Sequence, residues 1–277
     1  MKKSNSCANF PNFNFIFFEM NPVLIKIFYK IINRKTTSLL LSVVFFLAVS
    51  AADSFAQKNF SKTYPAAKNV RLQLTNRVGT VTVEGWDKDK IQINASMEEP
   101  AATIIPQNLS GKILINVVQD NQDRAEVGSC NFLIRVPFSS SVDIETRVGN
   151  LSVSNVQGGL VRAHISSEGD ITLMNINADS VTAENVMGDI FFDGSIQSNG
   201  TYRFTSMIGR INLRIPFNSS FRLVATAPST RSISLGDFSN EGLTFVGDGR
   251  RVVGRVGSGS ASLSITTRRG GISFIRR

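Results

Sequence analysis

A glycine followed by alternating apolar residues returns roughly every twenty residues along the chain, and this repeat restricts the possible folds more than any other feature. The central copies lie 20, 19 and 21 residues apart. The copies begin at Gly79, Gly149, Gly169, Gly188 and Gly209, with a degenerate copy at Gly259. A second short alternating segment precedes each central glycine. One repeat therefore reads as a strand, a tight corner at glycine, a second strand and another corner.

Strict alternation assigns the residues of each strand to two faces. Stacking successive repeats at the strand spacing of about 4.8 Å would align the inward residues into ladders that share one core. One expected ladder is Leu151, Ile171, Ile190 and Ile211, and the other is Val153, Leu173, Phe192 and Leu213. The pattern predicts an all-β fold, a β-solenoid (single-chain β-helix) with repeats of about 20 residues and atypical ends. The alternative is a β-sandwich, which gives no reason for the same glycine to return at this interval.

The ends of the repeat region are expected to act as caps. Residues 57–136 contain one clean repeat, around Gly79, and are predicted to form an N-terminal β segment and cap. Residues 137–277 are predicted to form solenoid repeats continuous with it. The tail from Gly270 onwards reads as a short edge strand, whose final pair, Arg276 and Arg277, would block the addition of another strand.

The first 56 residues have the pattern of a secretory signal. Basic residues precede the uncharged apolar run 38–52, and small residues follow it, which predicts cleavage between Ala56 and Gln57. Met20 is a plausible true start, because it leaves an ordinary basic segment before the apolar run. The run is shorter than the roughly 20 residues that span a bilayer, so an uncleaved anchor helix is the alternative. We expect an extracytoplasmic protein with no transmembrane span in its mature chain.

Charge and cysteine content narrow the classes of partner. The whole chain carries a formal net charge of +9, and removing residues 1–56 leaves +5, scattered along the length. Scattered charge is typical of a solvated β surface and not of a nucleic-acid interface, where it would be clustered. Cys130 would be the single cysteine of the mature chain, in an apolar stretch, so we expect a buried, unreactive thiol.

The repeats resemble the bacterial putative adhesin family, a secreted domain of unknown function related to the head domains of auto-transporter adhesins. The residues that carry the resemblance are 142–153 and 165–173, above all Ser166-Ser-Glu-Gly-Asp-Ile-Thr. The resemblance covers about residues 65–275 and implies an extracytoplasmic β-solenoid, with no catalytic residues to carry over. Arg77, Arg147 and Arg255 stand where the family tends to have serine.

Few residues have the pattern of a reactive site. His164 is the only histidine, at an outward position, and we interpret it as a surface residue. The sequence lacks the HExxH, CxxC and phosphate-loop motifs. Asn150, Asp170, Asp189 and Arg210 follow successive glycines and would stack along one corner. The three charged members are the candidate ligand-binding residues. The alternatives for this ladder are a calcium site, the acidic groups of a polysaccharide enzyme, or a hydrated structural turn.

These observations predict a secreted, non-enzymatic β-solenoid that acts as a binding or adhesin-like protein of the cell envelope. No metal or cofactor is expected, and the partner would be a glycan, an envelope protein or a second copy of the chain. The alternatives are a β-helix lyase or hydrolase acting on polysaccharide, and a structural or sensing component of the envelope.

Overall fold

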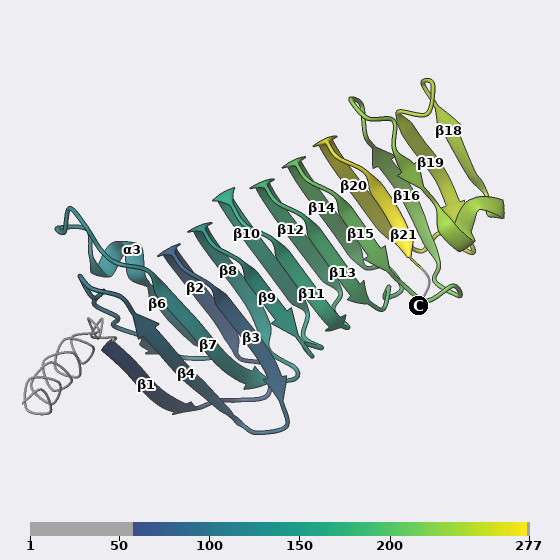
Figure 1. Cartoon of the computed structure of the whole chain (residues 1–277). Helices are drawn as coiled ribbons and strands as arrows, with labels where there is room; N and C mark the ends of the chain where they lie inside the picture. Colours follow the sequence, from purple (N-terminus) through teal and green to yellow (C-terminus); the bar gives the residue numbers. More distant parts are fainter. Residues whose placement is uncertain (1–57, 276–277) are drawn as a thin grey trace, which may run out of the picture. The chain divides into compact units, whose positions relative to one another are not determined.

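The computed structural model describes residues 58–275, which form two facing β-sheets built mainly from parallel strands (Figure 1). The leader, the cleavage position Ala56–Gln57 and the final arginines lie outside the described residues. Inward side chains of both sheets form one hydrophobic core between them. We call each pair of consecutive strands, one in either sheet, a rung. Within residues 58–275 no helix is both long and apolar enough to cross a membrane.

The ten strands of the first sheet follow one another in space in an order that differs from the chain order at both ends. In spatial order they are β1 (Lys58–Pro65), β4 (Lys90–Met97), β7 (Cys130–Pro137), β3 (Val81–Trp86), β9 (Leu151–Ser154), β11 (Ile171–Ile176), β13 (Ile190–Gly194), β15 (Ile211–Arg214), β21 (Ile272–Ile275) and β17 (Ile233–Ser234).

The second sheet has eleven strands and runs alongside the first. From the C-terminal end of the stack they are β18 (Leu243–Val246), β19 (Arg251–Val256), β16 (Phe221–Thr226), β20 (Ala261–Arg269), β14 (Thr201–Ile208), β12 (Ser180–Met187), β10 (Leu160–Glu168), β8 (Ser141–Val148), β2 (Arg71–Val78), β6 (Lys112–Asn116) and β5 (Gln107–Leu109). A four-residue helix, α3 (Val117–Asp120), follows β6, and a 3-10 helix, η1 (Gly236–Asn240), follows β17.

The central repeats form the predicted β-solenoid. Ile171 pairs in register with Leu151 on one side and Ile190 on the other, and Ile190 pairs with Ile211. All four side chains are fully buried, whereas the intervening Thr172 is partly exposed. The predicted ladder and the predicted facing are therefore confirmed.

The glycine corner, defined by Gly79, Gly149, Gly169, Gly188, Gly209 and Gly270, joins the two sheets along one edge of the stack. These residues need glycine for a reason beyond the turn itself. A Cβ atom on Gly188 would lie 2.1 Å from the carbonyl oxygen of Gly169, and one on Gly209 would lie 1.8 Å from that of Gly188. The backbones stack so closely that any side chain would enter the neighbouring rung. Gly259 was expected to belong to this series, but Gly270 occupies the corner position instead.

The C-terminal end corrects the expectation of a terminal edge strand. Strand β20 lies between β14 and β16, and β21 lies between β15 and β17, so the last rung in the sequence is an internal rung of the stack. The chain first passes this place to form β16–β19 and then returns to fill it. Strand β21 is paired on both sides, and the antiparallel strands β18 and β19 form the end of the second sheet.

At the N-terminal end, too, the spatial order of the rungs differs from their order in the chain. Strands β2 and β3 form one rung beside β8 and β9. The chain then leaves the stack, and β6 and β7 form a further rung outside β2 and β3. Antiparallel strands β4 and β1 continue the first sheet beyond β7, and β5 continues the second beyond β6. Residues 58–136 thus contribute two rungs, where the sequence indicated one, because the irregular segment 95–130 hides the second.

Candidate functional site

The residues predicted to stack at the glycine corner lie in one ladder of hydrogen bonds. The Oδ1 atom of Asn150 accepts the backbone N–H of Asp170 at 2.9 Å. Asp170 Oδ1 accepts the N–H of Asp189 at 2.7 Å, and Asp189 Oδ1 accepts that of Arg210, also at 2.7 Å. Each side chain therefore caps the next rung, and a backbone donor offsets part of the repulsion between the two carboxylates. A ligand-binding role for Asp170, Asp189 and Arg210 stays a prediction.

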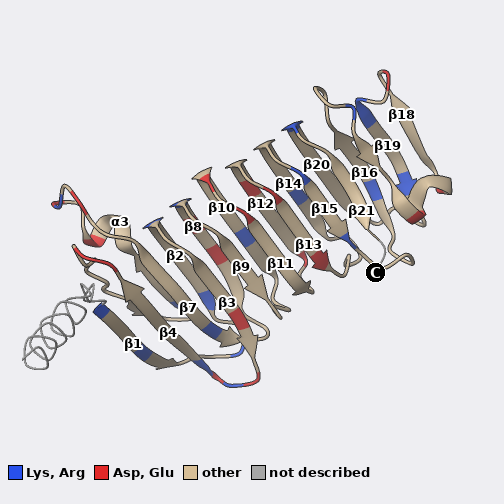
Figure 2. Ribbon diagram, viewed as in Figure 1, with Lys and Arg blue, Asp and Glu red and all other residues tan. Residues whose placement is uncertain are grey.

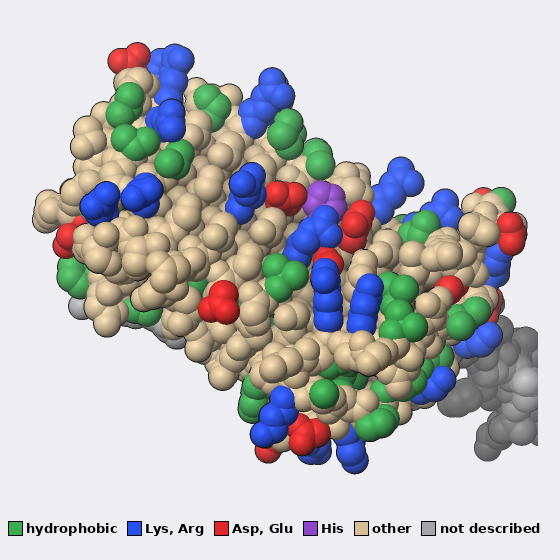
Figure 3. Space-filling view, turned by 180° about the vertical axis from the view of Figure 1, so that it is seen from behind, with side chains coloured by type: hydrophobic (Ala, Val, Ile, Leu, Met, Phe, Trp, Pro, Cys, Tyr) green, Lys and Arg blue, Asp and Glu red, His purple; other side chains and the backbone are tan. Residues whose placement is uncertain are grey.

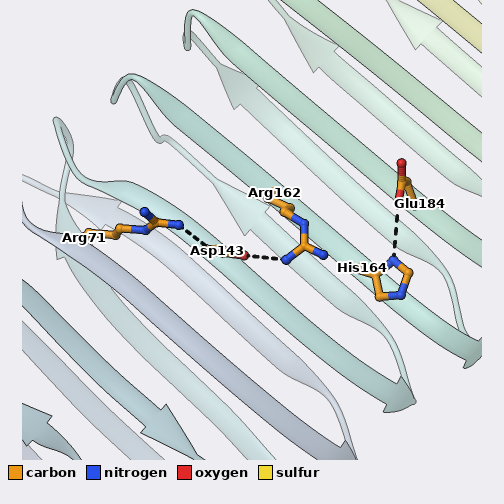
Figure 4. A network of polar contacts seen from close by, with 5 residues as sticks. All are labelled: Arg71, Asp143, Arg162, His164 and Glu184. Carbon is orange, nitrogen blue, oxygen red and sulfur yellow. Dashed lines mark hydrogen bonds and ion pairs between the residues drawn. The ribbon is translucent and has the colours of Figure 1, made fainter.

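The outer face of the second sheet carries a chain of ion pairs across three neighbouring strands (Figure 4). Asp143 on β8 contacts Arg71 of β2 at 2.7 Å and Arg162 of β10 at 3.1 Å. Its side chain is only 8% exposed, while both arginines are half-exposed. The arginine stems cover the carboxylate, so this group fastens three rungs together and has little surface left for a ligand.

His164 faces outward from β10, as predicted. Its Nδ1 atom lies 3.6 Å from Glu184 Oε2 on β12, and Glu145 occupies the matching position on β8. Figure 3 shows this face, with the histidine between acidic side chains and basic side chains beside them. Sequence reasoning missed both Glu184 and the partners of Asp143. The pair of Asp143 and Arg162 could have been found from the sequence, because the two residues are 19 residues apart and this is one repeat length.

Charged residues are distributed along the whole stack of residues 58–275 and do not gather in one block (Figure 2). On the first sheet, Arg214 contacts Asp193 at 2.7 Å and lies 5.7 Å from the centre of the Phe191 ring. The hydrogen bond and the charge of Asp193 raise the pKa of Arg214. Across the described part of the chain, no three His, Cys, Asp or Glu side chains come together as metal ligands would.

A shallow groove lined by uncharged residues crosses the outer face of the first sheet near its N-terminal end; its apolar members are Phe60, Ala95, Phe132 and Leu133. We call it the amide–hydroxyl groove; its volume is about 440 Å³. Its polar side chains come from β1, β4, β7, β3 and the residue before β3: Asn59, Ser61, Thr80, Thr82, Asn94, Ser96 and Asn131. Ser61 Oγ donates to Asn94 Oδ1 at 2.8 Å, and Asn131 Oδ1 accepts the N–H of Thr80 at 2.8 Å. These bonds fix two of the amides and leave further donors and acceptors at the surface.

Cys130 begins β7 inside the core, which confirms the expected burial. The side chain is 1% exposed. Desolvation raises the pKa of the thiol to about 12, so the neutral form persists at physiological pH.

Two facing sheets of stacked parallel rungs, with one core and polar outer faces, define this protein as a β-solenoid. The chain belongs to the Toastrack DUF4097 family, whose model matches residues 52–274. This agrees with the resemblance to putative adhesins that the repeats indicated.

The chain also matches solved structures of two bacterial proteins. A putative cell adhesion protein from Clostridium sporogenes ATCC 15579 is 15% identical, with a TM-score of 0.47 over 80% of this chain and 100% of that chain. A putative adhesin from Bacteroides fragilis NCTC 9343 is 10% identical, with a TM-score of 0.37 over 79% of this chain and 97% of that chain. No curated protein sequence matches the chain significantly.

Proposed function

We propose that this protein is an extracytoplasmic, non-enzymatic binding protein that holds a saccharide chain in the amide–hydroxyl groove, as an adhesin would. The observation that carries the proposal is the groove itself, in which amide and hydroxyl groups line four adjacent strands and no charged residue intervenes. Amides and hydroxyls both donate and accept hydrogen bonds, which matches the hydroxyl groups of a neutral sugar.

The rigid spacing of the strands supports a polymeric ligand. Neighbouring strands lie about 4.8 Å apart, so outward polar side chains on successive strands form a row with this spacing. An extended ligand chain that lies across the strands would contact similar hydrogen-bond donors at each step. Because the backbone of each strand is fixed by its neighbours, little ordering is required of the protein when the ligand binds.

The test compares two asparagines that point outward from the same sheet. Asn94 lines the groove, whereas Asn212 lies on β15, several strands away. With neutral polysaccharides in affinity electrophoresis, Asn94→Leu should weaken binding about tenfold, as expected for lost hydrogen bonds and a steric block. Asn212→Leu should leave binding unchanged. Equal retention by the two variants would contradict the proposal.

Cell fractionation with protease treatment of intact cells tests the extracytoplasmic part, which rests on the apolar run and the Ala56–Gln57 cleavage pattern. Recovery of the protein in the cytoplasm would overturn it. Release of reducing or unsaturated ends from a polysaccharide, lost in Asp170→Asn, would instead identify an enzyme.

A further inference from the structure

A second cavity lies where α3 and the loop after it meet the outer face of the second sheet. We call it the arginine pocket; its volume is about 570 Å³. Its floor comes from β2, β8 and β10, and its wall comes from residues 117–127. Three arginines line it, Arg77, Arg124 and Arg147, against a single acidic residue, Glu145.

Two of these arginines are brought together by the register of the sheet. Asn76 pairs with Thr146 and Val78 with Val148, so Arg77 lies opposite Arg147 on the adjacent parallel strand. Like charges on neighbouring strands destabilise a sheet. Within residues 58–275 neither guanidinium makes an ion pair, in contrast to Arg71 and Arg162 on the same face. The pocket thus holds two adjacent guanidinium groups that form no ion pair with Glu145 or with another described acidic residue.

The wall of the pocket is fixed by hydrogen bonds. The buried Asn121 accepts the N–H of Thr103 and donates to the carbonyl oxygens of Thr103 and Val117, each at 2.8 Å. Arg124 donates from Nη1 to the carbonyl oxygen of Ala101 at 2.6 Å and to Asn121 Oδ1 at 3.5 Å, which holds its guanidinium at the wall. Its Nε and Nη2 donors face no partner within residues 58–275. The site is therefore formed before any ligand arrives.

We propose that the arginine pocket binds the carboxylate of an acidic saccharide such as a uronate. The planar guanidinium matches a carboxylate through paired hydrogen bonds, and an anion here relieves the repulsion between Arg77 and Arg147. Two valines of the wall, Val118 and Val127, offer an apolar surface to the sugar ring. This inference rests on the proposed function in taking the ligand to be a saccharide.

Calorimetric titration of the purified protein with trigalacturonate tests the inference. Arg77→Gln and Arg147→Gln should each weaken binding about tenfold or more, because each removes charge-assisted hydrogen bonds. Glu145→Gln should tighten it, because a repulsive charge is lost. The matched controls are Arg222→Gln and Arg255→Gln. Arg222 and Arg255 are exposed and lie opposite each other on β16 and β19, outside the pocket, so these controls should change affinity less than about twofold.

Several outcomes would overturn the inference. These are no binding of trigalacturonate, equal binding of neutral trigalactose, equal binding of inorganic sulfate, or equal losses in the control variants. Loss of trigalacturonate binding in Asn94→Leu but not in Arg77→Gln would place the acid in the groove, so the pocket would fail and the proposed function would stand. If trigalacturonate binding depends on Arg77 and Arg147 but no neutral polysaccharide binds, the arginine pocket stands and the saccharide site in the amide–hydroxyl groove fails.

Discussion

The burial and hydrogen bonding of single residues in this protein are set by residues of the neighbouring rung. Asp143 is buried because arginines of two adjacent strands cover it, and Asp189 is hydrogen-bonded because Arg210 presents its N–H one rung further along. Cys130 is similar, since its backbone carbonyl oxygen would lie only 2.3 Å from a Cβ atom on Gly79. The environment of a residue therefore depends on the position one repeat away more than on its sequence neighbours.

Burial of Cys130 predicts a loss of stability at alkaline pH. The pKa of the thiol rises from 9.0 to about 12 on folding. Above pH 9 the unfolded chain loses this proton while the folded protein keeps it, so the free energy of unfolding falls as pH rises towards 12. The loss from this group is about 1 kcal/mol at pH 10.

Urea unfolding of the protein and of Cys130→Ala between pH 8 and pH 10 checks this. The variant is less stable at pH 8 because of the cavity, but its stability should decline less steeply. Parallel declines would show that the thiol does not contribute.

At the scale of elements, the corner decides how closely the rungs stack. Strand pairing alone would tolerate a small side chain at many turns, but here the corner backbones approach too closely for a Cβ atom. The repeated glycine is thus a packing requirement as well as a turn signal. The interpretation of each glycine as a residue of the turn was right but incomplete, because the neighbouring rung is not visible in one repeat.

Three alanine substitutions separate the two roles. Gly188→Ala places a side chain at a φ of +132° and puts its Cβ atom 2.1 Å from the carbonyl oxygen of Gly169. It should destabilise the protein by roughly 3 kcal/mol or more. Gly111→Ala has a φ of +72° in open space and should lose about 1 kcal/mol. Gly159→Ala has neither feature and should change stability by less than about 0.5 kcal/mol. Thermal unfolding measures all three, and equal effects of Gly188→Ala and Gly111→Ala would refute the stacking argument.

At the scale of the whole molecule, the chain order and the spatial order of the rungs differ at both ends. The last rung, β20–β21, joins the central stack to the C-terminal strands. The rung β20–β21 therefore contacts a neighbour on each side, whereas the last repeat of a simple solenoid contacts only one.

This topology predicts unequal effects of two deletions. Removing residues 261–277 takes away five buried apolar side chains and leaves β14 and β16 without the strand between them, so cooperative unfolding should be lost. Removing residues 58–65 takes away the edge strand β1, with Tyr64 as its one buried hydrophobic residue, and should only lower the melting temperature. Circular dichroism melts of both variants make the comparison. A cooperative melt of the C-terminal deletion at the normal temperature would contradict the proposed joining role of β20–β21.

The sequence by itself determined the rungs, their facing and their glycine corner, because these features follow from alternation and from a local turn repeated at a fixed interval. It also placed Asp170, Asp189 and Arg210 in one ladder, since equivalent positions of stacked repeats must coincide. Only the tertiary structure decided which rung lies beside which at the ends. An irregular segment such as 95–130 carries no period, and its place depends on which strand edges the rest of the chain leaves unpaired. For the same reason the arginine pocket was hidden: Arg77 and Arg147 are 70 residues apart, and only the pairing of β2 with β8 makes them neighbours.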